Sequence, residues 1–268
     1  MAATPYQCGI LKTLAAHRKQ RGESYVAGGI ALNQLLSAPR LSRDIDLFHN
    51  SQEAVAATWA ADRMLLAAAG YFVEPLREAP SFIEARVSRG TDRVIMQWAQ
   101  DSAFRFFPLL EDDLMGLVLH PFDVATNKVL AMAGRMESRD WIDMLNCDRN
   151  IQPLGYLAWA ACGKDPGYNP LSLLAEISRA HYSQAELDML DFSGFKPDAV
   201  LLGELWHEIL QMARGLCRHL PAGELGKCVI GRDGELFRGS AEELPEALKN
   251  QKVGFHEGRL GGSWPVFR

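Results

Sequence analysis

Apolar and polar residues alternate along the first half of the chain in patterns typical of a fold with both helices and strands. A stretch over Tyr6–Lys19 predicts a first helix, and an Ala-rich, amphipathic stretch over Ser51–Ala69 predicts another that ends at Gly70. Two apolar segments, Phe82–Val87 and Arg93–Trp98, predict strands joined by a hairpin. This succession favours an α/β (α+β) fold with a mixed sheet.

Helical patterns dominate after residue 151. We expect helices over four ranges, which are 154–161, 171–180, 184–190 and 198–220. Near the end, the apolar residues around Asp233-Gly234 predict a second hairpin over Cys228–Phe237. We therefore predict a core over residues 1–150 and a mostly helical C-terminal domain over residues 151–268.

Two aspartates one residue apart, Asp44 and Asp46, constrain function more than any other feature of the sequence. In a strand, side chains at i and i+2 share a face, so both carboxylates point the same way while Ile45 and Leu47 point into a core. Two adjacent carboxylates repel each other unless a divalent cation lies between them. The pair is therefore a candidate metal site.

Upstream of the aspartates, Gly28-Gly29 follows a short apolar run and precedes Ile30–Leu32, which can begin a helix. A strand, a turn without side chains and a helix N-terminus together form an anion site, because main-chain N–H groups can approach a phosphate closely. A phosphate site beside a metal pair predicts metal-dependent phosphoryl or nucleotidyl transfer. Either motif alone is common without function.

A third segment carries charged residues on a predicted helix that starts at Pro121. If one helix continued to residue 145, Lys128, Arg135, Arg139 and Asp143 would lie within an arc of about 80°. A break at Gly134 or at the step from 137 to 138 would leave tertiary packing to bring the halves together. The alternative is a solvated helix face with an Arg139–Asp143 pair.

These segments resemble the DNA polymerase β-like nucleotidyltransferases and, more narrowly, the AbiEii/AbiGii toxin-type branch. Its first pattern, Gly-Gly-x-Ala-Leu followed by Arg-x-Ser-x-Asp-Ile-Asp-Leu, is matched by Gly28, Gly29, Ala31, Leu32, Arg40, Ser42, Asp44, Ile45, Asp46 and Leu47. Its second pattern, a helical Lys followed by Arg-Asp-x-x-Asp-Leu, is matched by Lys128, Arg139, Asp140 and Asp143, with Met144 in place of Leu. The resemblance covers the first 150 residues.

The resemblance implies a nucleotidyltransferase, an enzyme that transfers phosphorus-containing groups. We expect Asp44 and Asp46 to hold Mg²⁺ or Mn²⁺ on an NTP, Lys128 to neutralise charge, and Asp143 to activate an acceptor hydroxyl or orient Lys128. The expected nucleotide-binding residues are Gly28, Gly29, Arg40, Ser42, Arg135, Arg139 and Asp140. The resemblance also implies a toxin-antitoxin or abortive-infection setting, with RNA such as tRNA as acceptor and an antitoxin protein as partner.

One position departs from the polymerase β-like pattern, which has a third carboxylate on a later strand. Here the polar residue at the expected place is Gln97, and an amide ligates a cation weakly and cannot act as a base. Glu84, Asp101 or Asp143 are candidates to replace the missing carboxylate. Loss of this ligand would otherwise favour a slow enzyme or a catalytically impaired nucleotide-binding protein.

Composition excludes few functions. The formal net charge of −5 excludes a uniformly basic surface for nucleic acid, although a cluster of Lys12, Arg18, Lys19 and Arg21 offers a local one. The five cysteines are scattered, which predicts reduced thiols. No segment has the length of a membrane span and no signal peptide is evident, so we expect a cytoplasmic protein without a membrane partner.

A small-molecule nucleotidyltransferase of the antibiotic-modifying kind is a further alternative. Such an enzyme needs an acidic pocket for an aminated acceptor. Acidic residues of the helical half that could line one are Glu176, Glu186, Asp188, Asp191, Glu204 and Glu208.

Overall fold

A computed structural model describes residues 3–266, which form two compact units. The first unit contains the chain up to Ala103, together with Leu109–His120 and the short segment Asp191–Ser193. The second contains Phe104–Pro108, Pro121–Leu190 and the chain from Gly194. The units thus divide near residue 120. The boundary between a core domain and a helical domain, which the sequence predicts at residue 150, stays a prediction.

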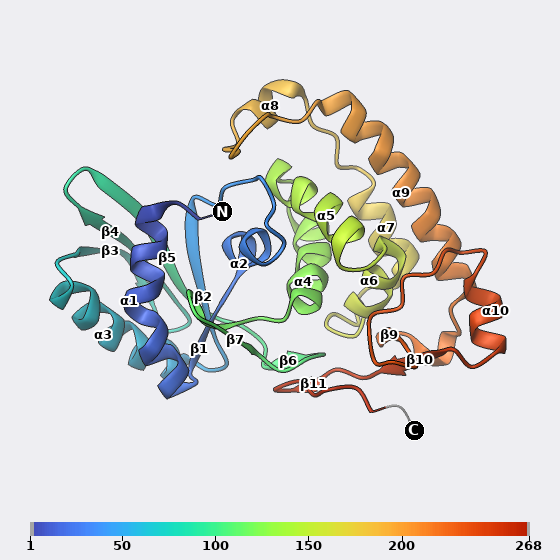
Figure 1. Ribbon diagram of the computed structural model, residues 1–268, viewed down its shortest axis with the longest axis horizontal. Coiled ribbons are helices and arrows are strands. Elements are labelled where there is room, and N and C mark those ends of the chain that lie inside the picture. Colours follow the sequence, from blue (N-terminus) through green and yellow to red (C-terminus); the bar gives the residue numbers. More distant parts are fainter. Residues whose placement is uncertain (1–2, 267–268) are drawn as a thin grey trace. The chain divides into compact units, whose positions relative to one another are not determined.

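A mixed sheet of seven strands, in the order β3-β4-β5-β2-β1-β8-β7, forms the first unit (Figure 1). Its strands are β1 (Ser24–Ala27), β2 (Asp44–His49), β3 (Phe72–Ala79), β4 (Phe82–Arg89), β5 (Asp92–Gln100), β7 (Leu110–Asp112) and β8 (Gly116–Val118). Strand β2 lies centrally, antiparallel to β1 and parallel to β5. The mixed sheet agrees with the predicted fold class.

Helices α1 (Pro5–Arg21) and α3 (Gln52–Ala68) pack on one face of this sheet, and both were predicted. Each begins where the sequence supplies a cap: the Thr4 hydroxyl accepts from the Gln7 N–H at 3.2 Å, and the Ser51 hydroxyl accepts from the Ala54 N–H at 3.2 Å. Under these helices lie the buried residues of alternate strand positions, including Ile45, Leu47, Ala85, Met96 and Trp98. The opposite face of the central strands is thereby left for polar side chains.

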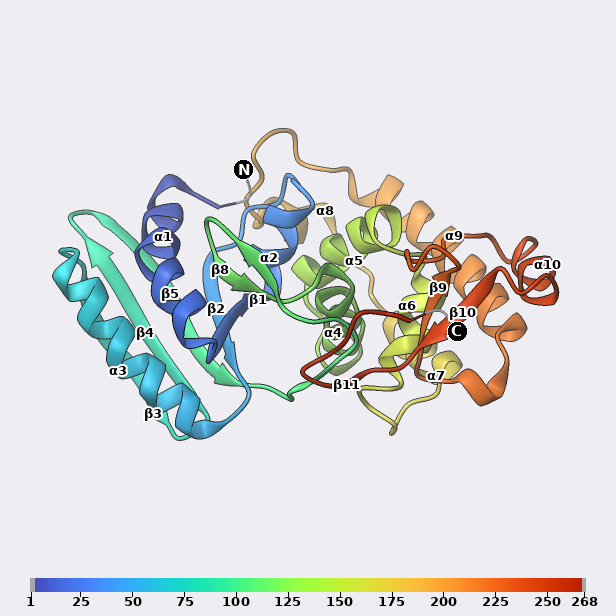
Figure 2. The ribbon, with the colours of Figure 1, turned by 60° about the horizontal axis from the view of Figure 1, so that its bottom comes forward.

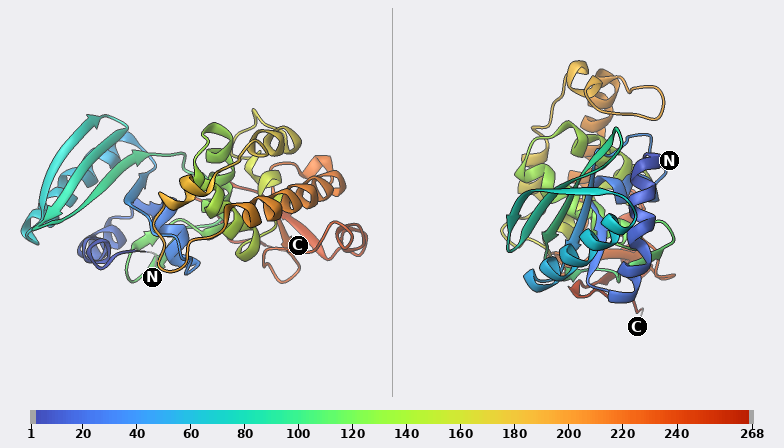
Figure 3. Two further views of the ribbon diagram at one scale, coloured as in Figure 1. Left: turned by 90° about the horizontal axis from the view of Figure 1, so that it is seen from above. Right: turned by 90° about the vertical axis from the view of Figure 1, so that its left-hand side faces the viewer.

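The second unit is mostly helical, as predicted. Its helices are α4 (Pro121–Gly134), α5 (Ser138–Asn150), α6 (Leu154–Ala161), α7 (Pro170–Ile177), α8 (Gln184–Asp188), α9 (Ala199–His219), the 3-10 helix η1 (Ala222–Glu224) and α10 (Leu244–Lys249). The long helix α9 packs against α6 and α7 (Figure 3). Within the described residues, no helix is both long enough and apolar enough to span a membrane.

Two small sheets complete the second unit. Strand β9 (Cys228–Gly231) pairs with β10 (Val253–His256) (Figure 2). Strand β6 (Phe104–Arg105) pairs with β11 (Arg259–Leu260) (Figure 1). The hairpin predicted over Cys228–Phe237 is therefore only partly correct. A tight turn does form, with the Gly231 N–H donating to the Glu235 carbonyl at 2.8 Å, but the strand partner of β9 comes from later in the chain.

The continuous helix considered from Pro121 to residue 145 is absent. Helix α4 ends at Gly134 and α5 begins at Ser138, because Glu137 is extended at φ −124° and ψ 126°. The charged residues therefore do not share a single helix face, and the alternative of two helices that pack together is correct.

Candidate functional site

The glycine turn and the aspartate pair are neighbours in the first unit. Strand β1 ends at Ala27, which lies opposite Asp46 in the antiparallel register, and α2 (Gly28–Leu35) starts at the next residue. Gly28 has φ +67°, and a Cβ atom built on it would lie 2.2 Å from Asp46 Oδ2. Only glycine combines that left-handed backbone with such a close carboxylate.

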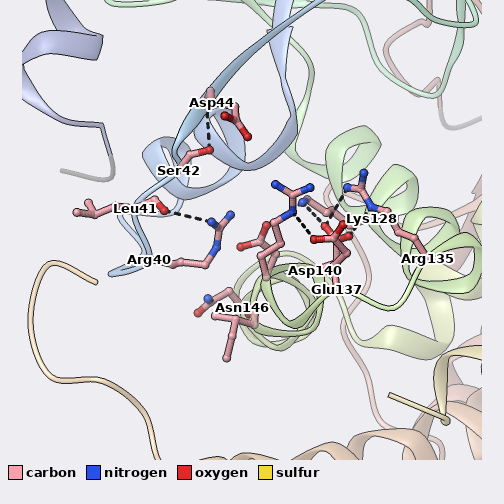
Figure 4. A network of polar contacts seen from close by, with 12 residues as sticks. Arg40, Leu41, Ser42, Asp44, Lys128, Arg135, Glu137, Asp140 and Asn146 are labelled. Atoms are coloured by element: carbon pink, nitrogen blue, oxygen red, sulfur yellow. Dashed lines mark hydrogen bonds and ion pairs between the residues drawn. The ribbon is translucent and has the colours of Figure 1, made fainter. Parts of the chain in front are cut away.

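Gly29, the next residue, is also approached closely by side chains. A Cβ atom on Gly29 would lie 2.5 Å from Arg40 Nη2 and 3.3 Å from Ser42 Oγ. Ser42 Oγ donates to the Asp44 carbonyl at 3.2 Å, and Arg40 Nη1 donates to the Leu41 carbonyl at 3.2 Å (Figure 4). The structure thus gathers the predicted residues of the first motif around the N-terminus of α2.

The N-terminus of α2 has the features of an anion site. Its N-cap residue is Ala27, whose methyl group cannot accept a hydrogen bond from the first helical N–H groups. A guanidinium and a hydroxyl, from Arg40 and Ser42, lie beside it. Main-chain donors, a cation and a hydroxyl are the groups that proteins use to bind phosphate.

The loop that carries Arg40 and Ser42 is held by contacts that sequence reasoning missed. Leu41 N–H donates to the Asp191 carbonyl at 2.8 Å, and Ser193 N–H donates to the Pro39 carbonyl at 2.8 Å. Arg43 and Asp191 also form an exposed ion pair, with Nε and Oδ2 2.6 Å apart. We call residues Asp191–Ser193 the strap. It follows α8 in the chain but belongs to the first unit.

Gln97 is the neighbour of Asp46 across the parallel β2–β5 pair, and Glu84 on β4 is the next residue in the same row. Gln97 Nε2 donates to Glu84 Oε2 at 2.9 Å. Asp101, which we considered as a substitute carboxylate, lies four residues beyond Gln97, about 13 Å along the strand. Asp101 is therefore too distant to replace Gln97.

Residues Asp44, Asp46 and Gln97 suit a magnesium ion by chemistry. All three offer oxygen atoms, and Mg²⁺ takes oxygen ligands, commonly one or two carboxylates together with water and substrate phosphates. Among residues 3–266 no cluster of three or more His, Cys, Asp or Glu side chains is arranged to hold a metal. An ion here would thus need ligands beyond the two aspartates.

The second predicted motif forms a buried ionic network between α4 and α5 in the second unit. Lys128 Nζ lies 2.6 Å from Asp140 Oδ1 (Figure 4). The same nitrogen lies 2.8 Å from Asp143 Oδ2. Arg135 Nε lies 2.8 Å from Asp140 Oδ2. Lys128 is 6% exposed, and both aspartates are fully buried.

Electrostatics favour the charged forms of Lys128 and Asp140. Burial disfavours charge on Lys128, but Asp143 and Asp140 outweigh it and raise the pKa of the lysine. Burial likewise opposes the charge on Asp140, yet Lys128 and Arg135 lower its pKa. The amine therefore stays an ammonium at neutral pH. An ammonium has three N–H donors, and the two carboxylates account for two of them.

Arg139 and the basic cluster of α1 have local partners. Arg139 Nε lies 3.2 Å from Glu137 Oε2, in the turn that precedes α5. Arg18 is buried and donates to the Met115 carbonyl, and Lys19 lies 3.5 Å from Asp113. The surface considered for RNA around Arg18 is therefore wrong at that residue.

Four of the six acidic residues considered for an aminated acceptor make local contacts. Glu176 pairs with Arg179, Asp191 pairs with Arg43, Glu186 caps α8 through Ser183, and Asp188 accepts from Gln184. These contacts give no support to an acidic pocket made by these residues.

This chain has the fold of toxin-type nucleotidyltransferases. It is similar to MenT4, a nucleotidyltransferase toxin from Mycobacterium tuberculosis, with a TM-score of 0.51 and 16% identity over 81% of this chain and 86% of the other. JHP933 from Helicobacter pylori gives a TM-score of 0.45 and 15% identity over 79% and 95%. No family model and no curated protein sequence matches the chain. At this level of identity the likeness concerns the fold alone.

Proposed function

We propose that the protein is a metal-dependent nucleotidyltransferase that uses an NTP. The observation that carries this proposal is the packing of Gly28 against Asp46, where a Cβ atom would lie only 2.2 Å from the carboxylate. This contact joins the phosphate-binding turn to the metal-binding pair, so that one nucleotide triphosphate can meet both. The shared fold with a nucleotidyltransferase toxin supports the same reaction.

Residues of the first unit are proposed to bind the nucleotide. Asp44 and Asp46 would hold Mg²⁺ or Mn²⁺, which supplies positive charge to the phosphates during transfer. The first N–H groups of α2, from Gly28 onward, would donate to phosphate oxygens, and Arg40 and Ser42 would add a cation and a hydroxyl. In-line positioning and charge neutralisation of this kind supply most of the catalysis of such transfers.

Residues of the second unit are proposed to contribute to turnover. Lys128, whose remaining N–H can donate to an anion, would neutralise charge that develops in the transition state. The 2.8 Å contact between Asp143 and Lys128 supports the role of Asp143 in orienting the lysine. Arg135 and Asp140 extend the same network, and Arg139 remains a candidate for binding phosphate.

We propose RNA, such as tRNA, as the acceptor, and an antitoxin protein as a partner. The likeness in fold to MenT4, which is a toxin, supports an antitoxin partner, and the RNA acceptor follows from the resemblance of the two motifs to the AbiEii/AbiGii toxin-type branch. Because four of the six acidic residues considered for it are engaged locally, a small aminated acceptor is the weaker proposal.

A labelling experiment tests the function. Purified protein is incubated with Mg²⁺ and each α-labelled NTP, with and without total RNA, beside a double Asp44→Asn, Asp46→Asn variant. Label in RNA that is lost in the double variant supports the proposal. Label on an added aminoglycoside would instead support the small-molecule enzyme, and nucleotide binding without transfer would support a catalytically impaired protein.

A further inference from the structure

Three polar side chains form one row across the centre of the sheet. Asp46 on β2, Gln97 on β5 and Glu84 on β4 lie opposite one another in consecutive strand pairs. Residues paired in register project from the same face of a sheet. All three are half-buried, whereas their neighbours Leu47, Trp98 and Ile83 are buried on the other face. The row therefore lies on the face that carries the aspartate pair.

The hydrogen bond between Gln97 and Glu84 determines which way the amide is turned. An ionised carboxylate can only accept, so the atom of Gln97 that meets Glu84 at 2.9 Å must be the nitrogen. The oxygen and nitrogen of an amide diverge from one carbon. The oxygen is consequently turned away from Glu84, and the strand on that side of β5 is β2, with Asp46.

We propose that Gln97 supplies a neutral oxygen ligand to the metal bound by Asp44 and Asp46, and that Glu84 is the positioning residue that presents this oxygen. This inference rests on the proposed function. It replaces the question of a lost carboxylate with a specific arrangement, in which the three metal ligands supply two negative charges and one amide dipole. Without a nucleotide, such a site binds a divalent ion more weakly than a site of three carboxylates would, because the triphosphate oxygens must supply the remaining negative charge.

Direct binding of Mn²⁺, followed by electron paramagnetic resonance without nucleotide, tests the arrangement. Gln97→Ala removes the ligand and should weaken Mn²⁺ binding about threefold or more. Glu84→Gln leaves the amide of Gln97 without a fixed orientation, because a second amide can both donate and accept, and should weaken binding by a smaller factor. Gln100→Ala, also on β5, is the matched control and should bind as the wild type does.

The exchanged pair gives the sharpest readout. The double variant Gln97→Glu, Glu84→Gln reverses the hydrogen bond, so a carboxylate faces Asp46 and an amide on β4 donates to it. We expect Mn²⁺ affinity about tenfold above that of the wild type. Gln97→Glu alone places two carboxylates side by side and should bind Mn²⁺ less tightly than the exchanged pair.

Several outcomes would contradict the inference. Wild-type affinity in Gln97→Ala, with unfolding free energy unchanged, would show that Gln97 is not a ligand. A larger loss in Glu84→Ala than in Gln97→Ala would make Glu84 itself the ligand. If the double Asp44→Asn, Asp46→Asn variant binds Mn²⁺ as the wild type does, the proposed metal-dependent function fails too. If only the Gln97 variants bind as the wild type does, the role of Gln97 fails and the proposed function stands.

Discussion

At the scale of single residues, two glycines with the same backbone conformation have different surroundings. Gly22 and Gly28 have φ +69° and +67°, but the space around a Cβ atom on Gly22 is open within 4 Å, whereas on Gly28 it is filled by Asp46. Alanine at Gly22 therefore introduces backbone strain only. Alanine at Gly28 introduces the same strain and also displaces a carboxylate.

Gly28→Ala is accordingly predicted to abolish Mg²⁺-dependent NTP binding, while Gly22→Ala leaves it intact. Both variants should lose stability by about 1 kcal/mol from the left-handed backbone, because a side chain is disfavoured there. Isothermal titration with an unreactive NTP analogue, together with urea unfolding, separates the two effects. Equal binding by the two variants would show that the approach of Asp46 to Gly28 has no role.

His49, at the end of β2, makes folding sensitive to mildly acidic pH. Nδ1 lies 3.2 Å from the Ala99 carbonyl and must donate to it, so in the neutral ring Nε2 accepts from the Thr58 hydroxyl at 2.5 Å. Burial of the ring lowers the pKa of His49 to about 4. The unfolded chain, with an ordinary histidine pKa near 6.5, binds a proton first as the pH falls.

Stability from His49 is therefore full above about pH 6.5 and decreases as the pH falls towards 4. Between pH 7.5 and 5.0 this residue should remove about 2 kcal/mol of the free energy of unfolding, which is 1.36 kcal/mol for each pH unit below 6.5. Urea unfolding of the wild type and of His49→Gln at both pH values measures the difference. An identical loss in the two proteins would rule out His49 as its source.

At the scale of elements, the sequence predicted those whose signals are local. Ser51 and Gly70 mark the ends of α3, and Gly90-Thr91 connects β4 to β5 in the predicted hairpin. Strand β3 was not predicted, because its mostly exposed residues lack an apolar alternation and Pro75 lies at a shift in register. The partner of β9 was wrong because β10 comes more than 20 residues later in the chain.

The same distinction explains the two motifs of the candidate site. Gly28, Gly29, Ser42 and Asp46 lie within 19 residues of one another, so a strand, turn and strand suffice to bring them together. The contacts of Lys128 with Asp140 and Asp143 depend on how α4 and α5 pack after the break at Glu137. The projection onto one helix grouped Lys128 with Asp143, but it assumed a continuous helix and left out Asp140, which contacts both Lys128 and Arg135.

The network between α4 and α5 makes Lys128 a structural residue in addition to any catalytic role. Lys128→Ala removes the ammonium that contacts both buried carboxylates, so stability should fall by about 3 kcal/mol. Lys12→Ala, an exposed lysine of α1, is the control and should change stability by less than about 0.5 kcal/mol. Urea unfolding of both variants measures the contrast, and similar values would contradict a buried network.

Asp143→Asn tests the contribution to turnover, because the amide keeps the shape and still accepts from Lys128. At a temperature where the variant is folded, we expect transfer to fall by at least about tenfold while binding of Mg²⁺ and NTP persists. Single-turnover labelling beside an equilibrium binding measurement gives both quantities. Unchanged transfer would remove Asp143 from the proposed mechanism.

At the scale of the whole molecule, the chain passes between its two units at short segments with strong local anchors. Phe104–Pro108 belongs to the second unit, where the Asp123 carboxylate accepts from the N–H groups of Phe106 and Phe107 at 2.9 and 3.0 Å and pairs with Lys164 at 2.8 Å. The strap belongs to the first unit, where main-chain hydrogen bonds join it to the loop that carries Arg40 and Ser42. Residues far apart in sequence thereby fix a loop of the candidate site.

The strap gives a prediction about the loop that carries Arg40 and Ser42, which lies about 150 residues earlier in the chain. The ion pair between Arg43 and Asp191 is exposed and worth little, so order in the loop should depend on the main-chain bonds instead. Ser193→Pro removes the N–H that donates to the Pro39 carbonyl, whereas Ser193→Ala removes only the hydroxyl, which donates to the same carbonyl at 3.2 Å.

We expect Ser193→Pro to speed hydrogen exchange at the Leu41 N–H and to weaken NTP binding several-fold, with Mn²⁺ binding by the aspartate pair retained. Ser193→Ala should resemble the wild type in all three measurements. If exchange at Leu41 is as slow in Ser193→Pro as in Ser193→Ala, the loop that carries Arg40 and Ser42 is ordered without the strap.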